Sequence, residues 1–145
     1  FCAGVAGYPE KHFEAPNMQT DLLNLKRKVD AGAEYIVTQM FFDNKKFFAF
    51  EKACREIGIT VPVIPGLKPI TSKKQLTIIP RTFYVDIPAD LSAEILKCTT
   101  DEDVEKVGTE WLLAQSKELK KAGVPVLHYY TLGKPHVVAN VVREL

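Results

Sequence analysis

A short segment near the start of the chain carries several side chains that could do chemistry. Tyr8, Glu10, His12 and Glu14 place a phenol, an imidazole and two carboxylates close together along the sequence. Imidazole and carboxylate groups are metal ligands, but such sites usually need a second His or Cys nearby, and the other histidines lie far along the chain. A loop of solvated charges is therefore favoured over a metal site.

Two cations and one amide also have the character of binding residues. Arg27 and Lys28 could hold a phosphate, because Arg offers a planar fork of donors and Lys a point charge, although an exposed basic pair on a helix is usually only solvated. Gln39 is a neutral amide in an otherwise apolar stretch, and leaving it unpaired would cost roughly 1 kcal/mol or more. We therefore expect Gln39 to bond a neighbour or a polar ligand.

Several classes of function lack their signature in this chain. The nucleophile motif G-x-S-x-G, the metalloprotease motif H-E-x-x-H and the Walker sequence are all absent. Lys and Arg total 19 against 18 for Asp and Glu, so charge predicts neither nucleic acid nor an anionic membrane as a partner. No apolar run approaches the roughly 20 residues that span a bilayer. Three widely spaced cysteines without a C-x-x-C pair indicate a reducing compartment, and we expect a cytoplasmic protein.

The pattern of apolar residues predicts the elements that would position these groups. Short apolar runs rich in β-branched and aromatic residues predict buried strands at 1–8, 34–41, 61–67 and 124–131. Helical spacing predicts helices at about 18–32, 44–57, 72–79, 100–123 and 137–145, with mostly helix and loop over 80–97. Ser72 is expected to cap the third helix, and Thr100 with Asp103 resembles a capping box. The aromatic cluster is more typical of core than of a cofactor site: Phe41, Phe42, Phe47, Phe48 and Phe50.

Strands that alternate with helices are typical of parallel βαβ units. Four units are too few for a closed eight-stranded barrel, and the abrupt apolar start at Phe1 favours a cut chain that forms half of a (βα)8 barrel. We predict one partial α/β domain over residues 1–145. In such a barrel the functional residues follow the C-terminal ends of the strands. We therefore expect the residues after the four predicted strands to face one mouth of the barrel. Its candidates are Tyr8, Glu10, His12, Glu14, Thr38, Gln39, Asp43, Lys68, Thr71, Gln75, Thr131 and Lys134.

Two segments carry a resemblance to a known family. They are the run from Val5 to His12 followed by the run from Asp21 to Ala33, and the run from Thr38 to Asp43. In order and spacing they closely resemble methylenetetrahydrofolate reductase. Pro65-Gly66-Leu67-Lys68-Pro69-Ile70 and His128-Tyr129-Tyr130-Thr131-Leu132 extend the likeness over nearly the whole chain.

The resemblance implies the C-terminal half of a (βα)8 TIM barrel, with FAD across its mouth. The flavin would take a hydride from NAD(P)H and pass it to methylenetetrahydrofolate. The matching positions imply these FAD contacts: Tyr8, His12, Ala15, Pro16, Asn17, Met18, Asp21, Asn24, Arg27 and Lys28. They also imply that Gln39, Gln75 and Lys134 contact the folate. Lys134 stands where bacterial relatives tend to have Arg, and Ile79 where some place an aromatic residue.

The general-acid Glu of the family and an Asp near its flavin belong to the first half of the barrel. The resemblance therefore implies that the segment alone is inactive and that the missing N-terminal half is its partner. Two alternatives stay open. The segment could be a non-catalytic half-barrel that covers its strand edges by self-association, or another barrel enzyme that binds phosphate through Arg27 and Lys28.

Overall fold

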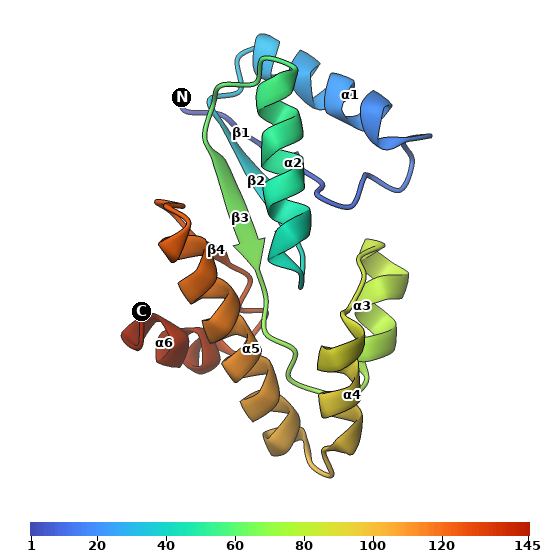
Figure 1. Cartoon of the computed structure of the whole chain (residues 1–145), viewed down its shortest axis with the longest axis vertical. Helices are drawn as coiled ribbons and strands as arrows, with labels where there is room; N and C mark the ends of the chain where they lie inside the picture. The colour runs from blue at the N-terminus through green and yellow to red at the C-terminus, as the bar shows by residue number, and fades with distance from the viewer.

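Four parallel strands form one sheet in this chain, in the order β1-β2-β3-β4. In the computed structural model, which describes all 145 residues, they span Gly4–Gly7 (β1), Tyr35–Met40 (β2), Val63–Leu67 (β3) and His128–Tyr129 (β4). The first two pair from Gly4 with Tyr35 to Gly7 with Thr38. Spatial order equals sequence order, so every crossover steps in the same direction (Figure 1). A doubly wound sheet would instead reverse its order at a switch point.

Six helices connect and follow the strands. Their bounds are Met18–Asp30 (α1), Asn44–Glu56 (α2), Gln75–Phe83 (α3), Ala89–Lys97 (α4), Asp101–Lys121 (α5) and Pro135–Arg143 (α6). Local chemistry sets several ends. Asn17 caps α1 by accepting from the Thr20 amide, and the predicted capping box of Thr100 and Asp103 is confirmed at α5. Gly32 and Gly123 follow helix ends with positive φ values of 115° and 88°, as the predicted helix ends require.

Two predicted boundaries are wrong. Ser72 does not cap the third helix: α3 begins at Gln75, its N-cap is Lys74, and no side chain caps it. The fourth strand was expected over 124–131 but pairs only at His128 and Tyr129. Pro125 has no backbone N–H to give to a ladder, and the Val124 amide bonds Leu119 at the end of α5 instead.

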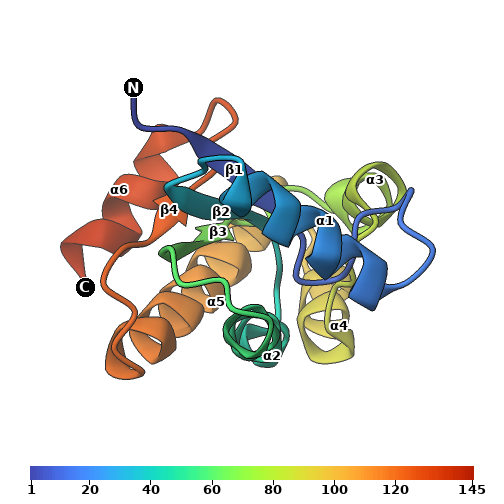
Figure 2. The same ribbon diagram turned by 90° about the horizontal axis from the view of Figure 1, so that it is seen from above.

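Helices α1, α2, α5 and α6 cover one face of the sheet. A single buried cluster joins Ile36 of β2 and Leu67 of β3 to side chains of all four helices. Those helical members are Leu22, Leu25, Phe47, Phe50, Cys54, Leu112, Leu119 and Val141. In the view from above, α2 and α5 lie on the same side of the strands (Figure 2). The prediction that the phenylalanine cluster is core is confirmed, because four of its members are buried and Phe48 packs against the cluster.

The opposite face of the sheet is only partly buried. Along β2, burial alternates: Ile36, Thr38 and Met40 are buried, whereas Tyr35 and Gln39 stay half-buried. Gly4 and Ala6 of β1 are exposed. The prediction of buried strands is therefore wrong for one face of β1 and β2. Helices cover one face, and successive side chains of a strand point to opposite faces.

Helices α3 and α4 form a separate hairpin beside the carboxyl end of β3 (Figure 1). A second buried cluster, which includes Met40, Ile70, Ile79, Leu91 and Ile95, holds it against α5. Gly108 allows α5 to approach the β3–α3 connection closely. A Cβ atom built on Gly108 would lie only 1.9 Å from the Ile70 carbonyl oxygen.

A tyrosine crosses the sheet at the same end. The Tyr130 hydroxyl, just after β4, donates a 2.9 Å hydrogen bond to the Thr38 carbonyl of β2. The ring passes over β3 at Gly66, where an added Cβ would lie 2.7 Å from the Tyr130 Cε2 atom. On the buried side the Thr38 hydroxyl accepts from the Gly66 amide at 2.9 Å. Burial, with the nearby Tyr8 phenol, raises the pKa of Tyr130, so the hydroxyl remains a donor at neutral pH.

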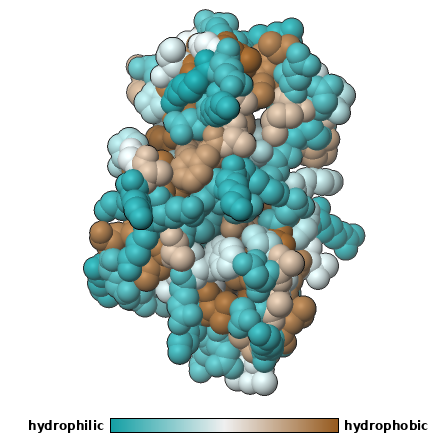
Figure 3. Space-filling model, in the orientation of Figure 1, coloured by the Kyte–Doolittle hydropathy of each residue, from teal (hydrophilic) through white to brown (hydrophobic).

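The surface is mostly hydrophilic on the face drawn in Figure 3, where hydrophobic side chains form separate patches. None of the six helices has the length and apolar character needed to cross a membrane. Cys2, Cys54 and Cys98 are free thiols, and burial raises the pKa of Cys54 to about 11, so it stays protonated.

Substituting Gly108→Ala should destabilise the protein. The new methyl group would meet the Ile70 carbonyl, which is backbone and cannot turn aside, so we expect a loss of roughly 2 to 3 kcal/mol in the free energy of unfolding. Urea denaturation measures this. Glu110→Ala, at an exposed position of the same helix, serves as the control. Equal stability of the two variants would contradict the close approach.

Substituting Tyr130→Phe removes the hydroxyl that bridges β4 to β2 and leaves the Thr38 carbonyl without that donor. We expect the free energy of unfolding to fall by about 1 kcal/mol. The matched control is Tyr35→Phe, because the Tyr35 hydroxyl makes no hydrogen bond in the structure. A fall of the same size in both variants would show that the hydrogen bond from Tyr130 to Thr38 does not contribute to the free energy of unfolding.

Candidate functional site

The loop after β1 is held by its own polar contacts. Lys11 adopts a positive φ of 75°, and its ammonium donates to the carbonyl oxygens of His12 at 2.8 Å and Ala15 at 2.6 Å. The His12 amide donates to the Asp21 carboxylate in the first turn of α1 at 2.8 Å. The rings of Tyr8 and His12 meet edge to face, with centroids 4.6 Å apart. The loop is thereby fastened to the start of α1.

This loop and α1 enclose a cavity of about 360 Å³. Seven of the ten residues predicted to contact a cofactor line it together with Glu14: Tyr8, His12, Ala15, Pro16, Asp21, Asn24 and Lys28. The other three lie at its border. Asn17 is the N-cap of α1, Met18 packs against the core, and Arg27 donates to the Asn24 side chain at 3.1 Å. The tertiary structure therefore brings the predicted set to one place.

Charges of both signs line this cavity: the Lys28 ammonium on one hand and the Glu14 and Asp21 carboxylates on the other. Lys28 and Arg27 are exposed on the last turns of α1, and neither forms an ion pair. The nearby Asp21 carboxylate already accepts the His12 amide. The two cations can therefore offer several donors to a phosphate. No group of three His, Cys, Asp or Glu side chains lies close enough to hold a metal ion.

A second group of predicted residues lies at the end of β2 and after β3, where two amides are fixed in orientation. The Gln39 side-chain oxygen accepts from the Met40 amide at 2.9 Å, so the expected bond to a neighbour is confirmed. The Gln75 side-chain oxygen accepts from the Thr71 amide at 2.7 Å. In both residues the carbonyl oxygen is engaged by the backbone, which leaves the amino group as the free donor.

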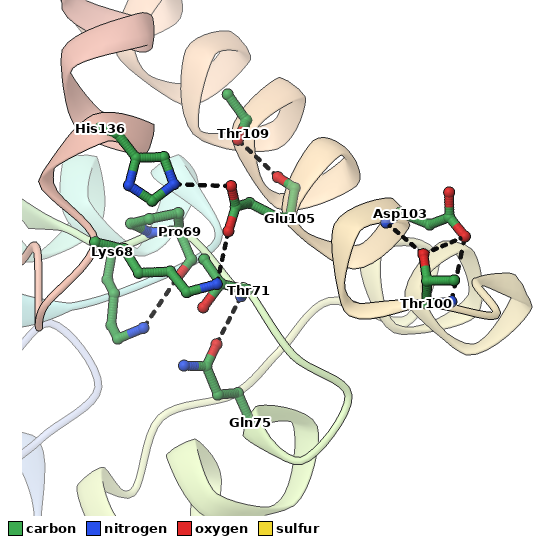
Figure 4. A network of polar contacts seen from close by, with 10 residues as sticks. Lys68, Pro69, Thr71, Gln75, Thr100, Asp103, Glu105, Thr109 and His136 are labelled. Carbon is green, nitrogen blue, oxygen red and sulfur yellow. Dashed lines mark hydrogen bonds and ion pairs between the residues drawn. The ribbon is translucent and has the colours of Figure 1, made fainter.

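Two lysines and a glutamate complete this group (Figure 4). Lys134 donates to Glu105 of α5 at 2.6 Å, and His136 contacts the other oxygen of that carboxylate at 3.0 Å. These contacts, led by the bond from Lys134, lower the pKa of Glu105. Lys68 is buried and donates to the Pro69 carbonyl at 2.9 Å. Burial and the nearby charge of Lys134 lower the pKa of Lys68.

Some residues nominated for the mouth have other roles. Asp43 caps α2 through the Lys45 amide and lines a different cavity, between α2, α4 and α5, so its predicted place in the mouth is wrong. Asp43 follows β2 and also directly precedes α2, and its short carboxylate bonds the free amide of the first helical turn instead of facing the mouth. Glu10 is largely buried, pairs with Lys46 and accepts the Asp86 amide at 2.9 Å, which ties the loop to neighbouring elements. Burial raises the pKa of Glu10.

Sequence reasoning missed the structural weight of two residues. Tyr130 was only part of an apolar strand pattern, and its bond across the sheet depends on the glycine at position 66. The sequence places Lys68 among the twelve candidates for the mouth without distinguishing it from them. Its position just after a strand was the only signal, since burial without a carboxylate partner is a tertiary property.

Comparison with known proteins connects this geometry to a family. The family profile described as methylenetetrahydrofolate reductase matches residues 1–145. The chain is 41% identical over 146 residues to 5,10-methylenetetrahydrofolate reductase of Escherichia coli, and 37% identical over 147 residues to a probable methylenetetrahydrofolate reductase (NADPH) of Caenorhabditis elegans. All of this chain is covered in both cases, but only 49% and 22% of the relatives. The chain thus spans about half the length of its bacterial relative.

A solved structure has a similar fold. A Clostridium thermocellum protein, described as binding two copies of 5-methyl-5,6,7,8-tetrahydrofolic acid, superimposes with a TM-score of 0.62 at 18% identity. The match covers 97% of this chain and 51% of that protein. At this identity the likeness concerns the fold. The profile match over the whole chain carries the assignment: the chain belongs to the methylenetetrahydrofolate reductase family.

Proposed function

We propose that this chain is the C-terminal half of the (βα)8 barrel of a flavin-dependent enzyme that reduces 5,10-methylenetetrahydrofolate to 5-methyltetrahydrofolate. The convergence of the family-matched residues on loops after successive parallel strands carries the proposal. Strands in sequence order and helices on one face are the arrangement expected of barrel units. The share of the bacterial relative that the chain covers supports a half-barrel.

We infer that the cavity beside α1 is part of an FAD site. Its lining combines two apolar residues with polar ones, and Lys28 with the adjacent Arg27 supplies two cations that form no ion pair within the chain. These would neutralise the diphosphate, Arg27 through parallel donors and Lys28 as a point charge. Asp21 would accept hydrogen bonds from hydroxyl groups of the same ligand, and Asn24 would accept from them or donate to them. The flavin, when bound, supplies hydride transfer from NAD(P)H to the methylene group of the folate.

The oriented amides of Gln39 and Gln75 would recognise the folate. Their oxygens are held by the Met40 and Thr71 amides, so their amino groups face a ligand as donors without reorganisation. Because these donors are already fixed, less conformational entropy is lost when the ligand binds. Lys134, tied to Glu105, would contribute a cation at the end of the same site.

The proposal assigns the general acid to the N-terminal half of the barrel, which is the required partner of this segment. We therefore infer that residues 1–145 alone do not turn over substrate. The half-buried sheet face, with Gly4 and Ala6 exposed, also favours a second candidate in which another copy covers that face in a non-catalytic dimer. A different phosphate-binding barrel enzyme would use the same two cations without a flavin.

The first experiment tests the flavin site. In the complete protein that contains this chain, the double substitution Arg27→Ala and Lys28→Ala should weaken FAD retention roughly 10- to 100-fold, because two charge-assisted contacts to the diphosphate are lost. Flavin absorbance after dialysis measures it. Lys26→Ala is the control, since Lys26 lies on the same helix but pairs with Asp30. Unchanged FAD retention in the double variant, or a parent protein that never binds flavin, would refute the assignment.

The second experiment tests the folate amides. Gln75→Glu keeps the oxygen that accepts the Thr71 amide but removes the amino donor, so KM for methylenetetrahydrofolate should rise about tenfold while FAD retention stays the same. Steady-state kinetics measures KM, and flavin absorbance after dialysis measures FAD retention. Gln19→Glu, an exposed position on α1, controls for the added charge. Equal KM values for the two variants would remove Gln75 from the substrate site.

A further inference from the structure

The loop after β1 that lines the cavity is tied to a segment far along the chain. The Asp86 amide, between α3 and α4, donates to the Glu10 carboxylate at 2.9 Å across 76 positions of the sequence. The rings of Phe13 and Tyr84 stack, with centroids 4.9 Å apart and an angle of 11° between their planes. In Figures 1 and 2 the loop lies beside α3. The α3–α4 hairpin therefore holds this loop in addition to α1.

Glu10 makes the polar part of this tie, and three segments meet at its carboxylate. The Oε1 atom that accepts the Asp86 amide also accepts from the Lys46 ammonium in the first turn of α2. Lys46 in turn bonds the Asp86 carboxylate at 2.6 Å. Only 10% of the Glu10 side chain is exposed, so water competes little for these bonds. None of the three residues lines the cavity, and Glu10 can therefore act on it only through the loop.

The place of Glu10 in the loop makes that action direct. Tyr8 and His12 line the cavity, and each is two positions from Glu10. Between them the backbone turns, because the Lys11 amide donates to the Tyr8 carbonyl at 3.0 Å and Lys11 adopts a φ of 75°. A side chain other than glycine is unfavourable at positive φ and persists there only where surrounding contacts hold the backbone. The Glu10 carboxylate supplies such a contact next to the turn.

We propose that Glu10 is a positioning residue for the cofactor: with the Phe13–Tyr84 stack it holds the loop in the conformation that binds FAD, so that FAD affinity depends on the α3–α4 hairpin. The inference rests on the proposed function. Releasing the loop would lower the fraction of molecules whose cavity is ready to bind, and the apparent Kd rises in inverse proportion to that fraction. Since α3 begins at Gln75, the same contacts join the proposed flavin residues to the helix that carries a proposed folate residue.

The first test removes the carboxylate in the complete protein that contains this chain. Glu10→Ala should raise Kd for FAD roughly tenfold, measured by titrating the flavin-free protein and following flavin fluorescence. Glu10→Gln is the conservative variant. Its amide oxygen can still accept from the Asp86 amide and from Lys46, so Kd should return to within about threefold of the parent value. Glu51→Ala is the matched control, because Glu51 also forms an ion pair, with Arg55, but on α2 and away from the cavity.

The second test changes the hairpin at a residue that does not line the cavity. Tyr84 is exposed and has a φ of 56°, a region that Asn adopts more readily than most residues, so Tyr84→Asn removes the ring without straining the backbone. We expect Kd for FAD to rise roughly three- to tenfold, because the stack with Phe13 is lost. Tyr84→Phe keeps the stacked ring and should restore the parent Kd. Thermal unfolding verifies that each variant is folded.

Both substitutions must weaken FAD binding for the inference to hold. A parent-like Kd in either Glu10→Ala or Tyr84→Asn would overturn it, and so would an equal rise in Glu51→Ala, since a general loss of stability would then explain the effect. Failure of Glu10→Gln to recover affinity has the same meaning. Should Glu10→Ala not fold, Tyr84→Asn against Tyr84→Phe decides. A parent protein that binds no FAD refutes the proposed function instead, which is a distinct result from FAD binding that is equal in all variants.

Discussion

Burial of one face of a parallel sheet is the constraint on which this structure depends. Four helices pack their apolar stripes against β2 and β3, and the strands run in the same direction and in sequence order. The carboxyl ends of the strands therefore meet at one edge, and the loops that follow them are neighbours. Residues as distant in sequence as Tyr8 and Tyr130 come together for this reason.

Backbone hydrogen bonds prepare the site for ligands. Amides of the chain hold the carbonyl oxygens of Gln39 and Gln75, and the carboxylate of Asp21, in one orientation. Each side chain then presents its remaining groups at fixed positions. Because the constraint comes from adjacent backbone, it needs no bound ligand, and binding need not order these groups.

Charge is distributed unequally over the two parts of the site. On α1 the cations Arg27 and Lys28 are exposed to solvent, which lowers the cost of leaving them unpaired. At the end of β3, Lys68 is buried, and the neighbouring carboxylate Glu105 is already engaged by Lys134.

The sequence by itself determined the elements and the family. Apolar periodicity, the Thr100 cap and the glycines at helix ends are local signals, because they depend on residues within a few positions of one another. They placed most helices and strands, and the runs Val5 to His12, Asp21 to Ala33 and Thr38 to Asp43 carried the resemblance. Only the tertiary structure decided which face of each strand is buried, that Asp43 caps a helix away from the mouth, and that Lys68 has no counter-ion. Those properties depend on side chains that are remote in sequence, and no local pattern records which remote groups will meet.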